Sequence, residues 1–196
     1  MFRLITFSVA ILLLIAALPG AGQDNSKKEV NMNTAPNLGD KAVDFTLPYA
    51  TRDSLVSEGL KLSGLYGNGA VVLAFYPADW SGGCTKEMCS FRDNFSQLQE
   101  LNARIVAISG DYVYSHHQWA KHHDLPFMLA SDYGGKLAKQ YESWSDEYGM
   151  CKRTVFVIDN QGKIVYRNLQ YSVKEDKDFN ALKEALAKLN QPAGKK

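Results

Sequence analysis

Two uninterrupted apolar runs with a helical pattern between them constrain the fold of this chain more than any other feature. Residues 71–76 and 104–109 are largely apolar and do not alternate, which is typical of strands that a sheet buries on both faces. The apolar residues between them recur every three or four positions, at Met88, Phe91, Phe95 and Leu98. This spacing predicts one helix from about Cys84 to about Asn102. A strand, a helix and a second strand in this order predict two parallel strands joined by a right-handed crossover.

The rest of the chain extends this alternation of strands and helices. Ser115 is a candidate N-cap for one further helix, and Asn160-Gln161-Gly162 predicts a hairpin turn. Further helices are expected at 115–123, 135–141 and 178–189, and further strands at 127–130, 154–159 and 163–168. The sequence therefore predicts an α/β fold with a mixed central sheet flanked by helices.

The composition fits one globular domain without a general attraction for nucleic acid or membranes. The chain has 196 residues, of which 45% are hydrophobic and 22% charged, and this is enough for one ordinary core. Its formal charge is +1, and removing residues 1–22, whose one charged side chain is Arg3, leaves 21 basic against 21 acidic residues. Because a neutral chain has no electrostatic preference for nucleic acid, the expected partners are small molecules and other proteins.

The N-terminus has the layout of a secretory signal peptide. Residues 1–22 begin Met-Phe-Arg, continue as an apolar run and finish Pro-Gly-Ala-Gly, so we expect export to the periplasm or beyond the cell. The alternative is an uncleaved membrane anchor, although an apolar run of about 15 residues is shorter than the ~20 that span a bilayer. Residues 23–37 are polar and aperiodic, which predicts a flexible linker. The folded domain is expected at 38–190.

The stretch 77–89, Pro-Ala-Asp-Trp-Ser-Gly-Gly-Cys-Thr-Lys-Glu-Met-Cys, carries the candidate chemistry. It places Cys84 in the first turn of the predicted helix. Unpaired backbone N–H groups and the positive end of the helix dipole there favour an anion, which for cysteine is the nucleophilic thiolate. Gly82 and Gly83 have no side chains that would block a small substrate.

The other cysteines and the histidines give no metal motif. Cys84, Cys89 and Cys151 are too few for a disulfide scaffold and lack the Cys-x-x-Cys spacing of a structural zinc site. The four histidines form two adjacent pairs, at 116–117 and 122–123, and we expect them on a solvated helix surface. No cofactor is expected.

The chain resembles the peroxiredoxins. Their active-site pattern, Pro-x-x-x-(Thr/Ser)-x-x-Cys, matches Pro77, Ser81 and Cys84, and a distant arginine that enters a late core strand matches Arg153. The resemblance continues into Thr85 and Glu87 and covers about residues 37–189. It implies the thioredoxin fold and a thiol peroxidase.

The resemblance also implies roles for the matching residues. Cys84 would attack the peroxide, and Ser81 would hydrogen-bond the peroxide and the thiolate. Arg153 would lower the pKa of the Cys84 thiol and stabilise the charge on the departing oxygen. Pro77 would end the strand and shield the thiolate, and Glu87 would orient the arginine. Plainer alternatives remain: Ser81 as a helix N-cap, Arg153 as a solubilising strand flank, and Glu87 as an acid attracted by the helix dipole.

The role of Cys89 decides which subclass of peroxiredoxin the chain resembles. Residues five apart in an ideal helix have Cα atoms about 8.6 Å apart, from a rise of roughly 7.5 Å and a chord of roughly 4.3 Å, whereas a disulfide needs less than about 7 Å. A bridge between Cys84 and Cys89 therefore requires the helix to unwind. The spacing resembles the Q-type, or bacterioferritin-comigratory, peroxiredoxins, in which the second cysteine resolves the sulfenic acid. The segment 141–159 is closer to one-cysteine alkyl hydroperoxidases, which would make Cys89 a packing residue, and Cys151 is a less favoured resolver.

The resemblance thus implies an exported peroxidase that reduces hydrogen peroxide and organic hydroperoxides through a sulfenic acid at Cys84. A thioredoxin-like protein would recycle it, and a homodimer is compatible with the family. The alternative of a thioredoxin-like thiol-disulfide oxidoreductase requires Cys-x-x-Cys, and a copper-delivery protein of the same fold requires Cys-x-x-x-Cys. The chain has neither spacing.

Overall fold

The structure is a computed structural model that describes residues 35–174 and 176–190. The expected signal peptide at 1–22, with the linker up to residue 34, lies outside the described residues. The described elements in chain order are β1 (Thr46–Ala50), β2 (Leu55–Lys61), the 3-10 turn η1 (Leu62–Leu65), β3 (Ala70–Phe75), α1 (Gly82–Asp93), α2 (Phe95–Glu100), β4 (Ala103–Ser109), α3 (Val113–His123), β5 (Met128–Ser131), α4 (Lys136–Gln140), β6 (Trp144–Ser145), β7 (Met150–Cys151), β8 (Thr154–Ile158), β9 (Ile164–Asn168) and α5 (Asp176–Leu189).

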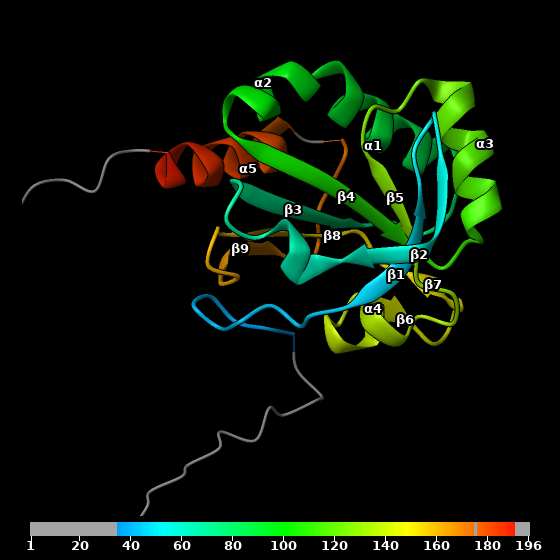
Figure 1. The fold of residues 1–196 in the computed structure, drawn as a ribbon, viewed down its shortest axis with the longest axis horizontal. Coiled ribbons are helices and arrows are strands. Elements are labelled where there is room, and N and C mark those ends of the chain that lie inside the picture. Colours follow the sequence, from blue (N-terminus) through cyan, green and yellow to red (C-terminus); the bar gives the residue numbers. More distant parts are fainter. Residues whose placement is uncertain (1–34, 175, 191–196) are drawn as a thin grey trace, which may run out of the picture. The chain divides into compact units, whose positions relative to one another are not determined.

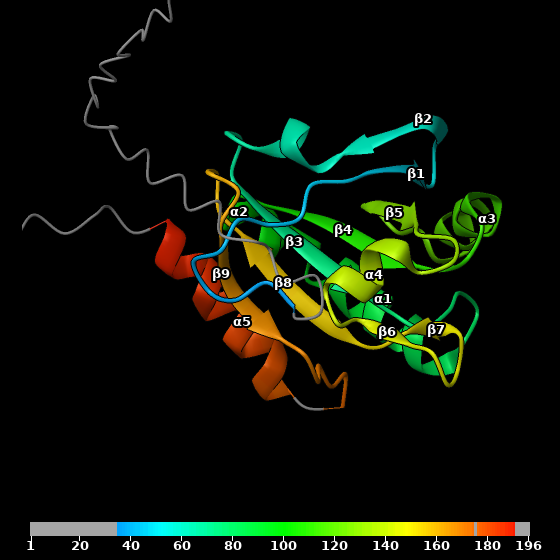
Figure 2. The ribbon, with the colours of Figure 1, turned by 90° about the horizontal axis from the view of Figure 1, so that it is seen from below.

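The centre of the fold is a mixed sheet in the order β2-β1-β5-β4-β3-β8-β9 (Figure 1). The pairs β3–β4 and β4–β5 are parallel, and the outer pairs are antiparallel. Figure 2 shows α5 at the β9 end of the sheet and α3 at the β1–β5 end. The predicted α/β class and the mixed sheet flanked by helices are confirmed.

The central strand β3 is buried on both faces, as its apolar run predicts. Its side chains alternate between two hydrophobic clusters. Val72 and Ala74 pack with residues of α1, α2, α3 and α5, while Val71 and Leu73 pack with η1, α4 and Ile164. The stretch 77–89 follows directly from this buried strand, so its starting point is held in place by both clusters.

The predicted crossover from β3 to β4 is present, but its helix is divided. Asn94 interrupts it with φ −103° and ψ 11°, so α1 and α2 replace the single helix expected from Cys84 to Asn102. The Asn94 side chain donates to the Ser90 carbonyl at 2.9 Å, and the Asn94 backbone N–H reaches the same carbonyl at 3.1 Å. An asparagine that competes for a backbone acceptor in this way favours a break in the helix.

Three further details differ from the sequence expectations. The predicted helix at 115–123 starts earlier, at Val113, with Tyr112 rather than Ser115 at its N-cap. A small hairpin of β6 and β7 was not predicted, because strands of two residues carry no measurable periodicity. Ala35 is buried in the core, so the last residues assigned to the linker pack against the domain.

Within residues 35–174 and 176–190, no helix is both long enough and apolar enough to cross a lipid bilayer.

Candidate active site

The candidate nucleophile Cys84 lies in the first turn of α1. Ser81 is the N-cap, with extended backbone at φ −80° and ψ 140°, and its hydroxyl accepts a hydrogen bond from the Cys84 N–H at 3.4 Å. The Cys84 side chain is fully buried. A sulfur at this position lies close to the positive end of the helix dipole, where a negative charge is stabilised.

Arg153 joins Cys84 to Glu87 across a long sequence separation. Its Nη2 donates to Cys84 Sγ at 3.2 Å, and its Nη1 donates to the Glu87 carboxylate. Cys84 and Glu87 share one side of α1 because they are three residues apart. The structure thus brings together three side chains that the sequence named, and their roles in a reaction remain predictions.

Gly83 makes room for this contact. A Cβ placed on Gly83 would lie 2.8 Å from Arg153 Nη2, whereas a Cβ on Gly82 would meet no atom within 4 Å. The sequence suggested that both glycines leave space for the substrate. The structure gives Gly83 a different role, since its missing side chain lets the guanidinium approach the sulfur.

Burial and neighbouring charges act in opposite directions on the pKa of Glu87 and on the pKa of Arg153. Burial raises the pKa of Glu87 to about 7, although the nearby Arg153 cation partly offsets the effect. Burial lowers the pKa of Arg153, but the charges of Glu87 and Cys84 outweigh this, and the net shift is upward. Glu87 is 1% exposed, and this burial is the cause of the raised pKa.

Ser81 and Pro77 lie in the loop between β3 and α1. The Ser81 hydroxyl donates to the Ala78 carbonyl at 3.3 Å while accepting from Cys84. The N-cap alternative for Ser81 therefore describes its contacts in this structure, and a peroxide contact stays a prediction. Pro77 is half-buried and follows Tyr76, whose N–H still pairs with the Ile108 carbonyl at 3.0 Å.

A buried polar network that the sequence analysis missed holds this loop in place. The Asp79 carboxylate accepts hydrogen bonds from the Tyr76 hydroxyl at 2.8 Å and the Ser115 hydroxyl at 2.7 Å, and it contacts His116 Nδ1 at 3.0 Å. The Asp79 backbone N–H donates to the Asp111 carboxylate at 2.8 Å. The loop before Cys84 is thus attached to the start of α3 and to the end of β4.

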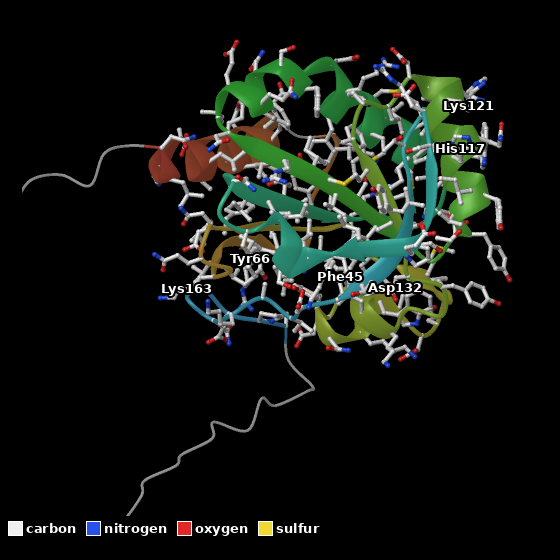
Figure 3. The ribbon with its side chains drawn as sticks, viewed as in Figure 1. Phe45, Tyr66, His117, Lys121, Asp132 and Lys163 are labelled. Carbon is white, nitrogen blue, oxygen red and sulfur yellow. The ribbon has the colours of Figure 1, made fainter. Side chains whose placement is uncertain are left out.

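The expectation of a solvated histidine surface is wrong for His116, which is fully buried. His117, labelled on α3 in Figure 3, is half-buried, and His122 is exposed. His116 shares a helix face with Trp119 and Ala120, which are also buried. The spacing of three and four residues between His116, Trp119 and Ala120 is the pattern that indicates a buried helix face. It was not recognised because His116 is adjacent to another polar histidine.

We expect His116→Ala to lower the free energy of unfolding by about 3 kcal/mol, because it empties a fully buried site and leaves the Asp79 carboxylate with only the Tyr76 and Ser115 hydroxyls as side-chain partners. The matched control is His117→Ala, which removes one contact to the Thr51 carbonyl and should cost about 1 kcal/mol or less. Urea denaturation of both variants gives the comparison. Equal losses would show that the Asp79–His116 contact does not stabilise the loop.

The two other cysteines occupy different surroundings. Cys89 is half-buried on α1, with Arg92 one helical turn further along. Cys151 lies in β7 and packs in the hydrophobic cluster on the sheet face opposite to that of Cys84. Burial raises the pKa of the Cys151 thiol well above its usual range, which disfavours the thiolate needed for attack on another sulfur.

The fold and the site together define a thioredoxin-fold protein with one cysteine at a helix N-terminus, contacted by a distant arginine. Residues 38–167 match the AhpC/TSA family. The chain belongs to this family, and the resemblance to peroxiredoxins is confirmed.

Named relatives agree with this assignment. Peroxiredoxin Bcp of Bacillus subtilis is 36% identical over 144 residues, covering 70% of this chain and 88% of that protein. The putative peroxiredoxin bcp of Coxiella burnetii is 38% identical over 133 residues, covering 65% and 84%. The chloroplastic peroxiredoxin Q of Sedum lineare is 44% identical over 101 residues, covering 50% and 54%. The chain thus spans about half the length of the plant relatives it matches.

Solved structures give the same result. Peroxidoxin BcpB from Mycobacterium tuberculosis superposes with a TM-score of 0.69 at 31% identity, covering 80% of this chain and 99% of that one. AhpC from Enterococcus faecalis has a TM-score of 0.66 at 21% identity and shares the fold. The thioredoxin fold and the similarity to Q-type and Bcp peroxiredoxins are therefore confirmed.

Proposed function

We propose that this chain is a thiol-dependent peroxidase that reduces hydrogen peroxide and organic hydroperoxides at Cys84. The observation that carries the proposal is the contact between Arg153 Nη2 and Cys84 Sγ at the N-terminus of α1. A buried cysteine with only a packing role needs no cation against its sulfur. The membership of the family and the Bcp relatives support the same activity.

The proposed reaction has one covalent step at sulfur. The Cys84 thiolate attacks one peroxide oxygen, an S–O bond forms and the O–O bond breaks. Sulfur is oxidised to the sulfenic acid, and the second oxygen leaves as hydroxide or alkoxide, which takes up a proton to become water or an alcohol. Arg153 stabilises the thiolate before the step and the negative oxygen during it. Ser81 can turn its hydroxyl from the Ala78 carbonyl to the bound peroxide.

The proposal includes recycling by a thioredoxin-like protein and action outside the cytoplasm. Export is inferred from the layout of residues 1–22. Peroxide consumption by the reduced chain, with thioredoxin, thioredoxin reductase and NADPH, tests activity and reductant together. The account predicts continuous turnover. A stoichiometric burst of peroxide consumption without turnover would support the peroxidase activity and reject thioredoxin as the reductant. If no peroxide is consumed at all, the peroxidase activity itself is rejected.

We expect Cys89 to resolve the sulfenic acid, so one equivalent of peroxide should give a disulfide between Cys84 and Cys89. Both residues lie within α1. Their Cα atoms would be about 8.6 Å apart in an ideal helix and must approach to less than about 7 Å for a disulfide to form. The helix should therefore unwind, with faster hydrogen exchange across residues 84–92. Peptide mapping by mass spectrometry would show the bridge.

The Cys89→Ser variant should accumulate the sulfenic acid after one turnover. If the wild-type chain accumulates it while residues 84–92 stay protected, Cys89 is a packing residue and the enzyme uses one cysteine. A bridge from Cys84 to Cys151 would instead require movement across the sheet and would reject Cys89 as the resolver.

A further inference from the structure

A small cavity includes Glu87, the carboxyl partner of Arg153, in its wall. Its volume is about 30 Å³, which exceeds the ~10–15 Å³ that one water molecule needs by the same measure. The lining residues come from α1, from the segment after β9 and from α5, and they include Glu87, Ser90, Tyr171, Ser172, Asp176 and Phe179. Ser90 and Asp176 are exposed, so the cavity reaches the protein surface.

The Glu87 carboxyl has one engaged oxygen and one without a partner. Its Oε2 accepts from Arg153 Nη1, while its Oε1 is buried and has no hydrogen-bond partner among residues 35–174 and 176–190. A buried carboxylate oxygen without a partner is costly, and a proton on the carboxyl or a water in the cavity reduces this cost. The cavity beside Glu87 is large enough to hold such a water and is lined in part by exposed residues.

Arg153 is shared between two acids. One guanidinium nitrogen contacts Cys84 Sγ and another contacts Glu87 Oε2. When the sulfur is a thiolate, one cation faces two groups that would both be negative if Glu87 were ionised. Two acids that share one cation titrate together, and loss of charge at one favours ionisation of the other.

We propose that Glu87 holds a proton while Cys84 is a thiolate and releases it to solvent through this cavity when oxidation removes the charge of the sulfur. The proposal rests on the peroxidase function stated above and adds a proton store to it. Glu87 does not contact the peroxide in this account. It is a positioning residue whose charge responds to the oxidation state of Cys84 through Arg153.

The balance of protons gives a measurable difference. The thiolate and hydrogen peroxide form the sulfenic acid and hydroxide, and the hydroxide takes one proton to become water. Without a store, the reaction takes that proton from bulk solvent. With Glu87 as the store, its carboxylic acid becomes a carboxylate and returns one proton, so the net uptake falls toward zero.

The effect should appear only where Glu87 is protonated in the reduced enzyme. Burial raises the pKa of Glu87 to about 7, so the carboxyl is mostly neutral at pH 6.5 and mostly ionised at pH 8.5. The groups that face it from the surrounding elements are Cys84, Arg153, Tyr171 and Asp176. Burial and the charge of Glu87 raise the pKa of Tyr171, which therefore stays neutral in this range.

The test is proton uptake per peroxide consumed, measured with a pH-indicator dye in weak buffer. A Cys89→Ser background stops the reaction at the sulfenic acid. At pH 6.5 we expect Glu87→Gln to take up more protons than the parent, with a difference that approaches one proton per peroxide as the pH is lowered further. At pH 8.5 the two should agree. Glu184→Gln, which removes an exposed carboxyl from α5, should match the parent at both pH values.

Equal uptake by the parent and Glu87→Gln at pH 6.5, with peroxide consumed, would overturn the proton store and leave the peroxidase intact. No peroxide consumption by either chain would reject the peroxidase itself. If Glu87→Gln does not fold, carbon-13 NMR of carboxyl-labelled glutamate in the parent gives the answer. One glutamate signal should change from the neutral to the ionised position on oxidation at pH 6.5, and no change would overturn the proposal.

Discussion

Cys84→Ser should abolish peroxide reduction while the domain keeps its fold. The substitution removes the nucleophile, and a serine hydroxyl has no comparable reactivity toward an O–O bond. The change in volume is small, and Arg153 Nη2, which now donates to Cys84 Sγ, can donate to the hydroxyl instead. We expect the peroxide concentration to fall no faster than in the absence of protein, with an unchanged circular dichroism spectrum.

The matched control is Cys151→Ser, which exchanges the same atoms in the cluster on the other face of the sheet. It should keep the rate of the peroxide step, since Cys151 and Cys84 belong to different hydrophobic clusters on opposite faces of the sheet. Wild-type activity in Cys84→Ser would remove the basis of the proposed mechanism. A loss of activity in both variants would point to a general defect in folding.

Arg153→Ala should slow the peroxide step by about two to three powers of ten, because one preorganised charge interaction at the transition state is lost. The second-order rate constant with hydrogen peroxide, measured in a stopped-flow instrument, gives the effect directly. The rate constant of Arg153→Lys should fall between those of the wild type and Arg153→Ala, since a lysine keeps the charge but cannot contact Cys84 and Glu87 with separate nitrogens.

The control for general loss of a cation is Arg52→Ala, because Arg52 pairs with Asp124 in an exposed ion pair at 2.7 Å. Surface pairs of this kind contribute little, so its rate constant should be unchanged. An unchanged rate constant in Arg153→Ala would show that the arginine only flanks the strand, which was the plainer alternative from the sequence.

The sequence predicted the centre of the fold because burial of β3 on both faces leaves an uninterrupted apolar run. Residues 71–76 carry this signal without help from distant parts of the chain. The break at Asn94 was not predictable from apolar spacing, because the apolar pattern continues through it to Leu98. There a local side-chain hydrogen bond to Ser90 overrides a correct helical periodicity.

The residues of the candidate site could be predicted from the sequence, but the contacts between them could not. Cys84, Glu87 and Arg153 were named from the motif, but the contact between Arg153 and Cys84 joins residues 69 positions apart. Such a contact depends on the pairing of β3 with β8, which no local pattern encodes. The Asp79–His116 contact was missed for the same reason, since its partners lie 37 positions apart on different elements.

The most direct test of the central claim is a single turnover of the reduced chain with one equivalent of hydrogen peroxide. Dimedone traps any sulfenic acid, and peptide mass spectrometry locates it. The account predicts that the peroxide disappears and that oxidation falls on Cys84, as the dimedone adduct or as the bridge to Cys89. Unconsumed peroxide, or oxidation at Cys89 or Cys151 with Cys84 still a free thiol, would contradict it.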